Sequence, residues 1–79
     1  MKIYDPDTKR TLNNVMLFLT REEAAELGFS ATDLFEHPEK QHHHVNDADY
    51  KKEITISVYT EGNIESFDEE SKRVILETE

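Results

Sequence analysis

The amino-acid sequence predicts an α+β fold, in which one antiparallel sheet of about four strands has two or three helices packed on one face. The expected order of elements is β-β-α-β-β-α, within a single small domain that covers residues 1–79. Three local patterns support this prediction: an alternating strand at residues 53–60, turn residues at 46–49, and a helix start at residues 20–23. A chain of this length is near the lower limit at which one hydrophobic core suffices without disulfides or metals.

The first twenty residues are predicted to form a strand, a turn and a second strand. Residues 5–8 (Asp-Pro-Asp-Thr) have the composition of a β-turn, and the residue before proline is kept out of the helical region. Residues 15–20 are then apolar on both sides of an extended chain, with Met16 and Phe18 in one of the two rows. A strand of this kind is either covered on both faces or presents one face to a partner.

A helix is predicted to begin after Thr20. Thr20 and Glu23 form a capping box, in which each side chain satisfies a free backbone amide of the first helical turn. The apolar residues that follow fall on one stripe at helical spacing: Ala24, Leu27, Ala31, Leu34 and Phe35.

Two arrangements of this helical region fit the sequence. A single helix over residues 21–36 leaves Phe29 on the solvated side. A break at Gly28 gives two short helices, at 21–27 and 31–36, and lets Phe29 pack on the second one as a hydrophobic staple. We favour the break, because glycine terminates helices well and a second capping pattern follows it. The His-Pro pair after the second helix is expected to end the helical region.

The central segment is predicted to form a β-hairpin. Asparagine and aspartate at residues 46–49 favour a turn, and β-branched residues then alternate with polar ones. We pair Asn46 with Lys51 across a four-residue loop. The apolar row of the second strand is then Ile54, Ile56 and Val58.

This pairing divides the three central histidines between the two faces of the hairpin. His43 and Val45 share the apolar face, so we expect His43 to be a partly buried structural residue. His42 and His44 point to the polar face, with Glu53 beside them. Imidazoles with a carboxylate suit Zn²⁺, so His42, His44 and Glu53 are the candidate metal ligands. An exposed polar strand face gives the same pattern without any metal.

The C-terminal segment is predicted to be a helix. Its apolar stripe is Ile64, Phe67, Ser71, Val74 and Ile75. Acidic residues precede the basic ones, which suits the helix dipole. Residues 74–76 (Val-Ile-Leu) by themselves also fit a strand, so the end of the helix stays open.

The charge of the chain limits its partners. Nine basic and eighteen acidic residues give a net charge of −9, which repels nucleic-acid backbones and anionic membranes. Basic proteins or cations are the partners that this charge favours, although the solvated acidic helix faces of a soluble bacterial-type protein are the commoner explanation for it. The sequence contains no cysteine, which fits a reducing compartment, and no run of 18 apolar residues. We therefore expect a cytoplasmic protein.

Catalysis is not expected, because the sequence lacks a cysteine nucleophile, a glycine-rich phosphate loop and any recognisable catalytic spacing. No cofactor is expected either. The hypothesis is a small acidic protein-binding or regulatory module of the inhibitor or immunity type, and the alternative is a metal-binding domain that uses His42 and His44. In the first case Met16, Phe18 and Tyr59 are expected to lie on an uncovered sheet face that binds a protein partner or a second copy. The N-terminal segment of the same chain is the other possible cover for that face.

Overall fold

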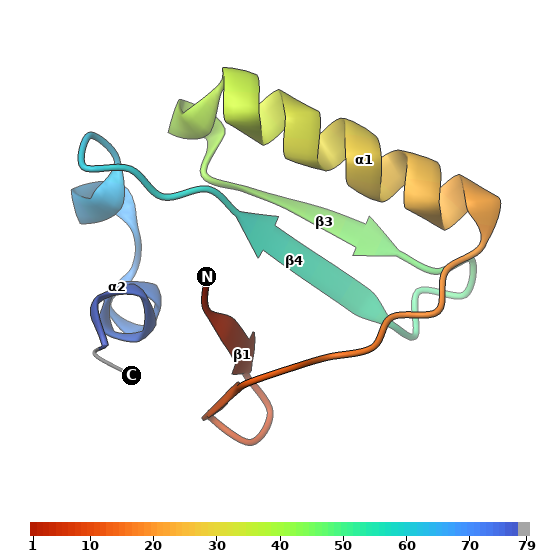
Figure 1. The fold of residues 1–79 in the computed structure, drawn as a ribbon, viewed down its shortest axis with the longest axis horizontal. Helices are drawn as coiled ribbons and strands as arrows, with labels where there is room; N and C mark the ends of the chain where they lie inside the picture. The colour runs from red at the N-terminus through yellow and green to blue at the C-terminus, as the bar shows by residue number, and fades with distance from the viewer. Residues whose placement is uncertain (78–79) are drawn as a thin grey trace. The chain divides into compact units, whose positions relative to one another are not determined.

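The computed structural model describes residues 1–77 and confirms the α+β class (Figure 1). This part of the chain contains two α-helices and two antiparallel sheets of two strands each. The elements in order are β1 (Ile3–Asp5), β2 (Arg10–Leu12), α1 (Arg21–Glu36), the 3-10 turn η1 (Pro38–Lys40), β3 (His42–Asn46), β4 (Glu53–Ser57), the 3-10 turn η2 (Ile64–Ser66) and α2 (Glu69–Leu76). The expected order of strands and helices is therefore present in outline.

The single four-stranded sheet is replaced by two separate hairpins, β1 with β2 and β3 with β4. The second strand forms earlier than predicted, because the turn after Asp5 closes a short local hairpin in which Asp5 pairs with Arg10. The Asp5 carboxylate accepts a hydrogen bond of 2.9 Å from the amide of Asp7, which stabilises this turn. Residues 15–20 belong to no strand, contrary to the prediction.

The chain divides into two compact units. We call Leu19–Ile64 the central unit, and residues 1–18 together with the chain from Glu65 onward the terminal unit. The central unit contains α1 and the β3–β4 hairpin, and the terminal unit contains the β1–β2 hairpin and α2. Whether the chain is one domain, as the sequence predicts, stays a prediction.

The core of the central unit lies between α1 and β3. Leu34 on the helix is 0% exposed, and Val45 on the strand is buried. The helix contacts β3 more extensively than β4, and Figure 1 shows it running alongside the hairpin. The apolar residues of β4 are consequently only half-buried.

Helix α1 is continuous from Arg21 to Glu36, so the predicted break at Gly28 is wrong. The predicted capping box is present: the Glu23 amide donates to the Thr20 hydroxyl at 3.1 Å, and the Thr20 amide donates to the Glu23 carboxylate at 2.9 Å. Gly28 has no positive φ. Burial of Ser30 and Leu34 beyond it offsets the weak helix propensity of glycine. Phe29 is 68% exposed, as expected for an unbroken helix.

A buried asparagine connects two segments of the central unit. The Asn63 side chain is buried and donates 2.9 Å hydrogen bonds to the carbonyl oxygens of Pro38 and Val58. Its carbonyl accepts a hydrogen bond of 2.7 Å from the amide of Thr60. These bonds fasten the chain after β4 to the turn that follows α1. A fully satisfied buried amide of this kind is costly to replace.

Helix α2 (Glu69–Leu76) carries the main stabilising contacts of the terminal unit. Asp68 caps this helix by accepting a hydrogen bond of 2.7 Å from the amide of Ser71, so the helix begins later than predicted and Ile64 lies in η2. Val74 is buried, and residues 74–76 are helical rather than extended. The Tyr4 hydroxyl donates to the Glu70 carboxylate, which raises the pKa of Tyr4 and lowers that of Glu70.

Because α1 is continuous, Gly28→Ala should stabilise the protein by up to about 1 kcal/mol through helix propensity. A Cβ atom at Gly28 meets nothing within 4 Å, so no steric cost opposes this gain. Thermal or urea unfolding measures the change. Ala31→Gly, on the same exposed flank of the helix, is the matched control and should destabilise by about the same amount. A lower melting temperature for Gly28→Ala would contradict the continuous helix.

Candidate functional site

The β3–β4 hairpin has the predicted faces but a different register. Asn46 pairs with Glu53 rather than Lys51, so the connecting loop covers residues 47–52. The register is displaced by two residues, and an even displacement leaves every side chain on its predicted face. His43 and Val45 accordingly share the face covered by α1, and His42 lies on the other face.

His43 is half-buried, as predicted, and binds a partner that the sequence did not identify. Its Nε2 lies 2.7 Å from Oδ2 of Asp33, near the end of α1. The same oxygen accepts a hydrogen bond of 2.8 Å from Nζ of Lys40. The Asp33 side chain is only 14% exposed, and these bonds, from Lys40 first and then His43, lower its pKa. Asp33 therefore links the end of the helix to the start of β3.

The proposed metal ligands lie on the exposed face of the hairpin. The rings of His42 and His44 are in edge contact, with centroids 5.1 Å apart. Nδ1 of His44 lies 2.8 Å from the Thr55 hydroxyl and 3.5 Å from the Glu53 carboxylate. Nevertheless, residues 1–77 contain no group of three or more histidine or acidic side chains placed to hold a metal ion. The structure therefore brings the two histidines together without completing a ligand set.

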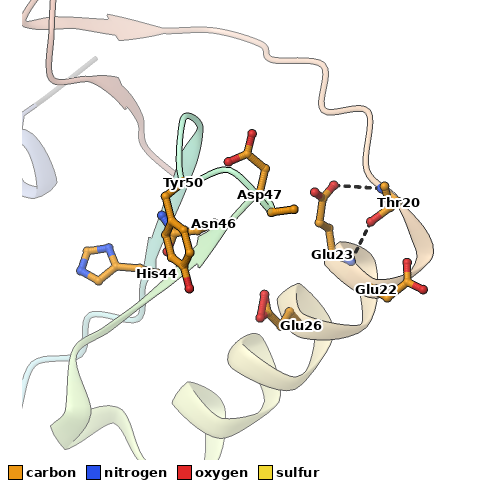
Figure 2. Close-up of a pocket in the computed structure, with 9 residues that line it drawn as sticks. Thr20, Glu22, Glu23, Glu26, His44, Asn46, Asp47 and Tyr50 are labelled. Atoms are coloured by element: carbon orange, nitrogen blue, oxygen red, sulfur yellow. Dashed lines mark hydrogen bonds between the residues drawn. The ribbon is translucent and has the colours of Figure 1, made fainter.

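A groove of about 620 Å³ lies between the first turns of α1 and the β3–β4 loop (Figure 2). Four of its side chains are acidic, and none is a lysine or an arginine. The lining residues are Thr20, Glu22, Glu23, Glu26, His44, Asn46, Asp47, Ala48 and Tyr50. The groove lies wholly within the central unit.

The carboxylates of the groove have different surroundings. Glu23 is occupied by the capping box, and Asp47 accepts hydrogen bonds from the amides of Lys51 and Lys52 at 2.8 and 3.1 Å. These bonds, chiefly that from Lys52, lower the pKa of Asp47. Glu22 and Glu26 are exposed, and neither forms an ion pair or hydrogen bond with another described residue. They are the carboxylates that remain available to a ligand.

Tyr50 is the aromatic residue of the groove, and the sequence did not single it out. It is 80% exposed and has a φ of 57°, in the left-handed region that large side chains rarely adopt. The Tyr50 amide donates to the carbonyl of Asp47 at 3.1 Å, and the Asp47 carboxylate accepts hydrogen bonds from the amides of Lys51 and Lys52, so the loop is fixed on either side of Tyr50. Figure 2 shows the ring beside His44, with Glu26 opposite on the helix. The signal in the sequence is an aromatic residue inside a polar turn.

The predicted protein-binding residues are exposed but belong to different units. Met16 and Phe18 lie in the terminal unit, in the segment that forms no strand, and Phe18 is 85% exposed. Tyr59 follows β4 in the central unit and is about half exposed. The single binding face that would contain all three stays a prediction.

Comparison with known proteins identifies no relative, because no family model, no curated protein and no solved structure matches the chain. Within residues 1–77, no helix is long and apolar enough to cross a membrane.

The position of Asp33 leads to a prediction about acid stability. A carboxylate with a lowered pKa in the folded state stabilises the protein above its unfolded pKa, near 4, and that contribution is lost as the pH falls through the folded value. Asp33→Asn should therefore lower the free energy of unfolding at pH 6, and the difference from wild type should shrink below about pH 4. Urea unfolding across this pH range measures it. Asp49→Asn, in the exposed loop, should cause little loss at either pH; a loss equal to that of Asp33→Asn would contradict the proposed role of Asp33.

Proposed function

We propose that the protein is a noncatalytic binding module of the inhibitor or immunity type, which takes a lysine or arginine side chain of a partner protein into the groove. The observation that carries this proposal is Tyr50, an exposed aromatic ring in a strained backbone conformation that lines the same groove as the unpaired carboxylates of Glu22 and Glu26. Backbone strain in a large residue persists only where the surrounding structure enforces it, and such positions cluster at functional sites.

The chemistry of the groove suits a basic side chain. Glu22 and Glu26 lie on the same helix, four residues apart, and offer charge-assisted hydrogen bonds to an ammonium or guanidinium group. The face of Tyr50 offers a cation–π contact. The net charge of −9 also attracts a basic partner at a distance and speeds the encounter. The ion pair with the ligand would not be fully buried, because the groove is open to solvent.

A binding role also fits what the groove lacks. It contains no cysteine, and its one histidine, His44, lies against Thr55 rather than against a nucleophile within the groove. Glu22 and Glu26 form no hydrogen bond or ion pair with another described residue. A cytoplasmic location, inferred from the absence of cysteine, forms part of the same proposal.

Charge reversal in the groove tests the proposal. The probe is a fluorescent decapeptide of alternating lysine and glycine, and a glutamate–glycine decapeptide is the negative control. Glu26→Lys should weaken binding of the basic peptide by roughly tenfold or more, since it replaces an attraction by a repulsion. Glu36→Lys is the matched control, because it changes the net charge equally at an exposed site outside the groove, at the other end of α1. Equal weakening by both variants would show that net charge alone causes binding and would contradict the groove.

Tyr50→Ala separates the aromatic contribution from the charges. It leaves every carboxylate in place and should weaken binding of the same peptide through loss of the cation–π contact. Unchanged affinity in Tyr50→Ala would remove the observation on which the proposal rests.

Metal binding is the second candidate, supported by the edge contact between His42 and His44. If the pair binds Zn²⁺, metal addition should shift the ring signals of both residues in NMR spectra, and His42→Ala or His44→Ala should abolish the effect. His37, exposed at the end of α1, serves as the control, since His37→Ala should change nothing. Tight binding lost only in the first two variants would favour the metal function. Equal shifts at His37 would indicate nonspecific binding.

A further inference from the structure

The outer edge of β4 has an unpaired ladder of backbone groups. In the central unit β4 pairs with β3 only. The amide of Val58 donates to the carbonyl of Gln41 at 3.1 Å, and the amide of Asp47 donates to the carbonyl of Lys52 at 3.3 Å. Because hydrogen-bonded pairs alternate along an antiparallel ladder, Ile54 and Ile56 direct their backbone groups toward β3. The backbone N–H and C=O groups of the intervening residues point outward: Glu53, Thr55 and Ser57.

The apolar layer at this edge is incomplete. Ile54, Ile56 and Val58 are each half-buried, because α1 lies mainly over β3. A two-stranded sheet is marginal by itself and gains stability from further strands. An additional strand beside β4, bringing its own apolar row, would extend this layer and cover the open edge.

The strand is complementary to itself. When two β4 strands pair antiparallel about a two-fold axis at Thr55, each Thr55 faces Thr55 of the second copy, and Glu53 faces Ser57. Beyond the strand, Lys51 faces Tyr59, which permits a cation–π contact. No like charges oppose each other within β4, although the chain as a whole is strongly acidic.

We propose that β4 is a dimerisation strand: a second copy of the chain adds its own β4 to the open edge, and the two hairpins form one continuous four-stranded antiparallel sheet. The sheet predicted from the sequence would then be completed between two chains rather than within one. The proposal is independent of the groove, whose lining contains no residue of β4. A strand of five residues gives a small interface, so the dimer should dissociate in the micromolar to roughly millimolar range.

Hydrogen exchange tests the proposal directly on the wild-type protein. The outward amides of Glu53, Thr55 and Ser57 should exchange rapidly in dilute solution and slow by roughly tenfold or more as the concentration approaches about 1 mM. The inward amides of Ile54 and Ile56 are the internal control, because they should be protected at every concentration. Protection of the outward amides that does not change with concentration, or a monomer by sedimentation at about 1 mM, would overturn the proposal.

Paired charge variants locate the two-fold axis. Thr55→Lys alone and Thr55→Glu alone should each prevent dimerisation, because like charges then face each other across the axis. An equal mixture of the two should restore a dimer with one copy of each. Thr11→Lys and Thr11→Glu, in the exposed strand β2, make the same charge changes and should leave dimerisation unaffected. Circular dichroism verifies folding, and a dimer that persists in both Thr55 variants would place the interface elsewhere.

Discussion

The packing of α1 against β3 is the interaction on which the rest of the central unit depends. A two-stranded hairpin has little stability in water. Here helix α1 packs on β3, and Leu34 of the helix and Val45 of the strand are buried. Asp33 adds a polar connection at one end by binding His43. The other end of the same helix forms one wall of the groove. Loss of this packing would therefore remove the groove together with the core of the central unit.

The chain has half as many basic as acidic residues, so many of its carboxylates have no basic partner. Within residues 1–77, Lys9, Lys40 and Lys72 each bind carboxylates of their own unit and thereby support its structure. Two of the four acidic residues of the groove, Glu22 and Glu26, have no such lysine partner. Some of the negative charge is thus neutralised at contacts that support the fold, whereas Glu22 and Glu26, like exposed carboxylates outside the groove such as Glu36 and Asp49, form no ion pair with another described residue.

Features that depend on neighbouring residues were predictable from the sequence, and features that depend on tertiary contacts were not. The capping box at 20–23 was correct because its bonds are local. The break at Gly28 was wrong because burial of Ser30 and Leu34 beyond the glycine outweighs a propensity of about 1 kcal/mol. Residues 15–20 have the composition of a strand, but composition alone does not show which other strand they would pair with, and they form no strand. Asp33 and Tyr50 were missed because folding, rather than spacing along the chain, gives them their surroundings.

The backbone conformation of Tyr50 also limits how far this protein can be stabilised without loss of the proposed binding contact. The left-handed conformation costs a tyrosine about 1–3 kcal/mol that a glycine would not incur, yet neither glycine of the chain has a positive φ. Selection for thermostability alone would therefore favour glycine at position 50, and the resulting protein would fold better while losing its aromatic contact. If Tyr50 has the proposed binding role, stability and recognition compete at this residue, and a screen for melting temperature alone would discard its side chain.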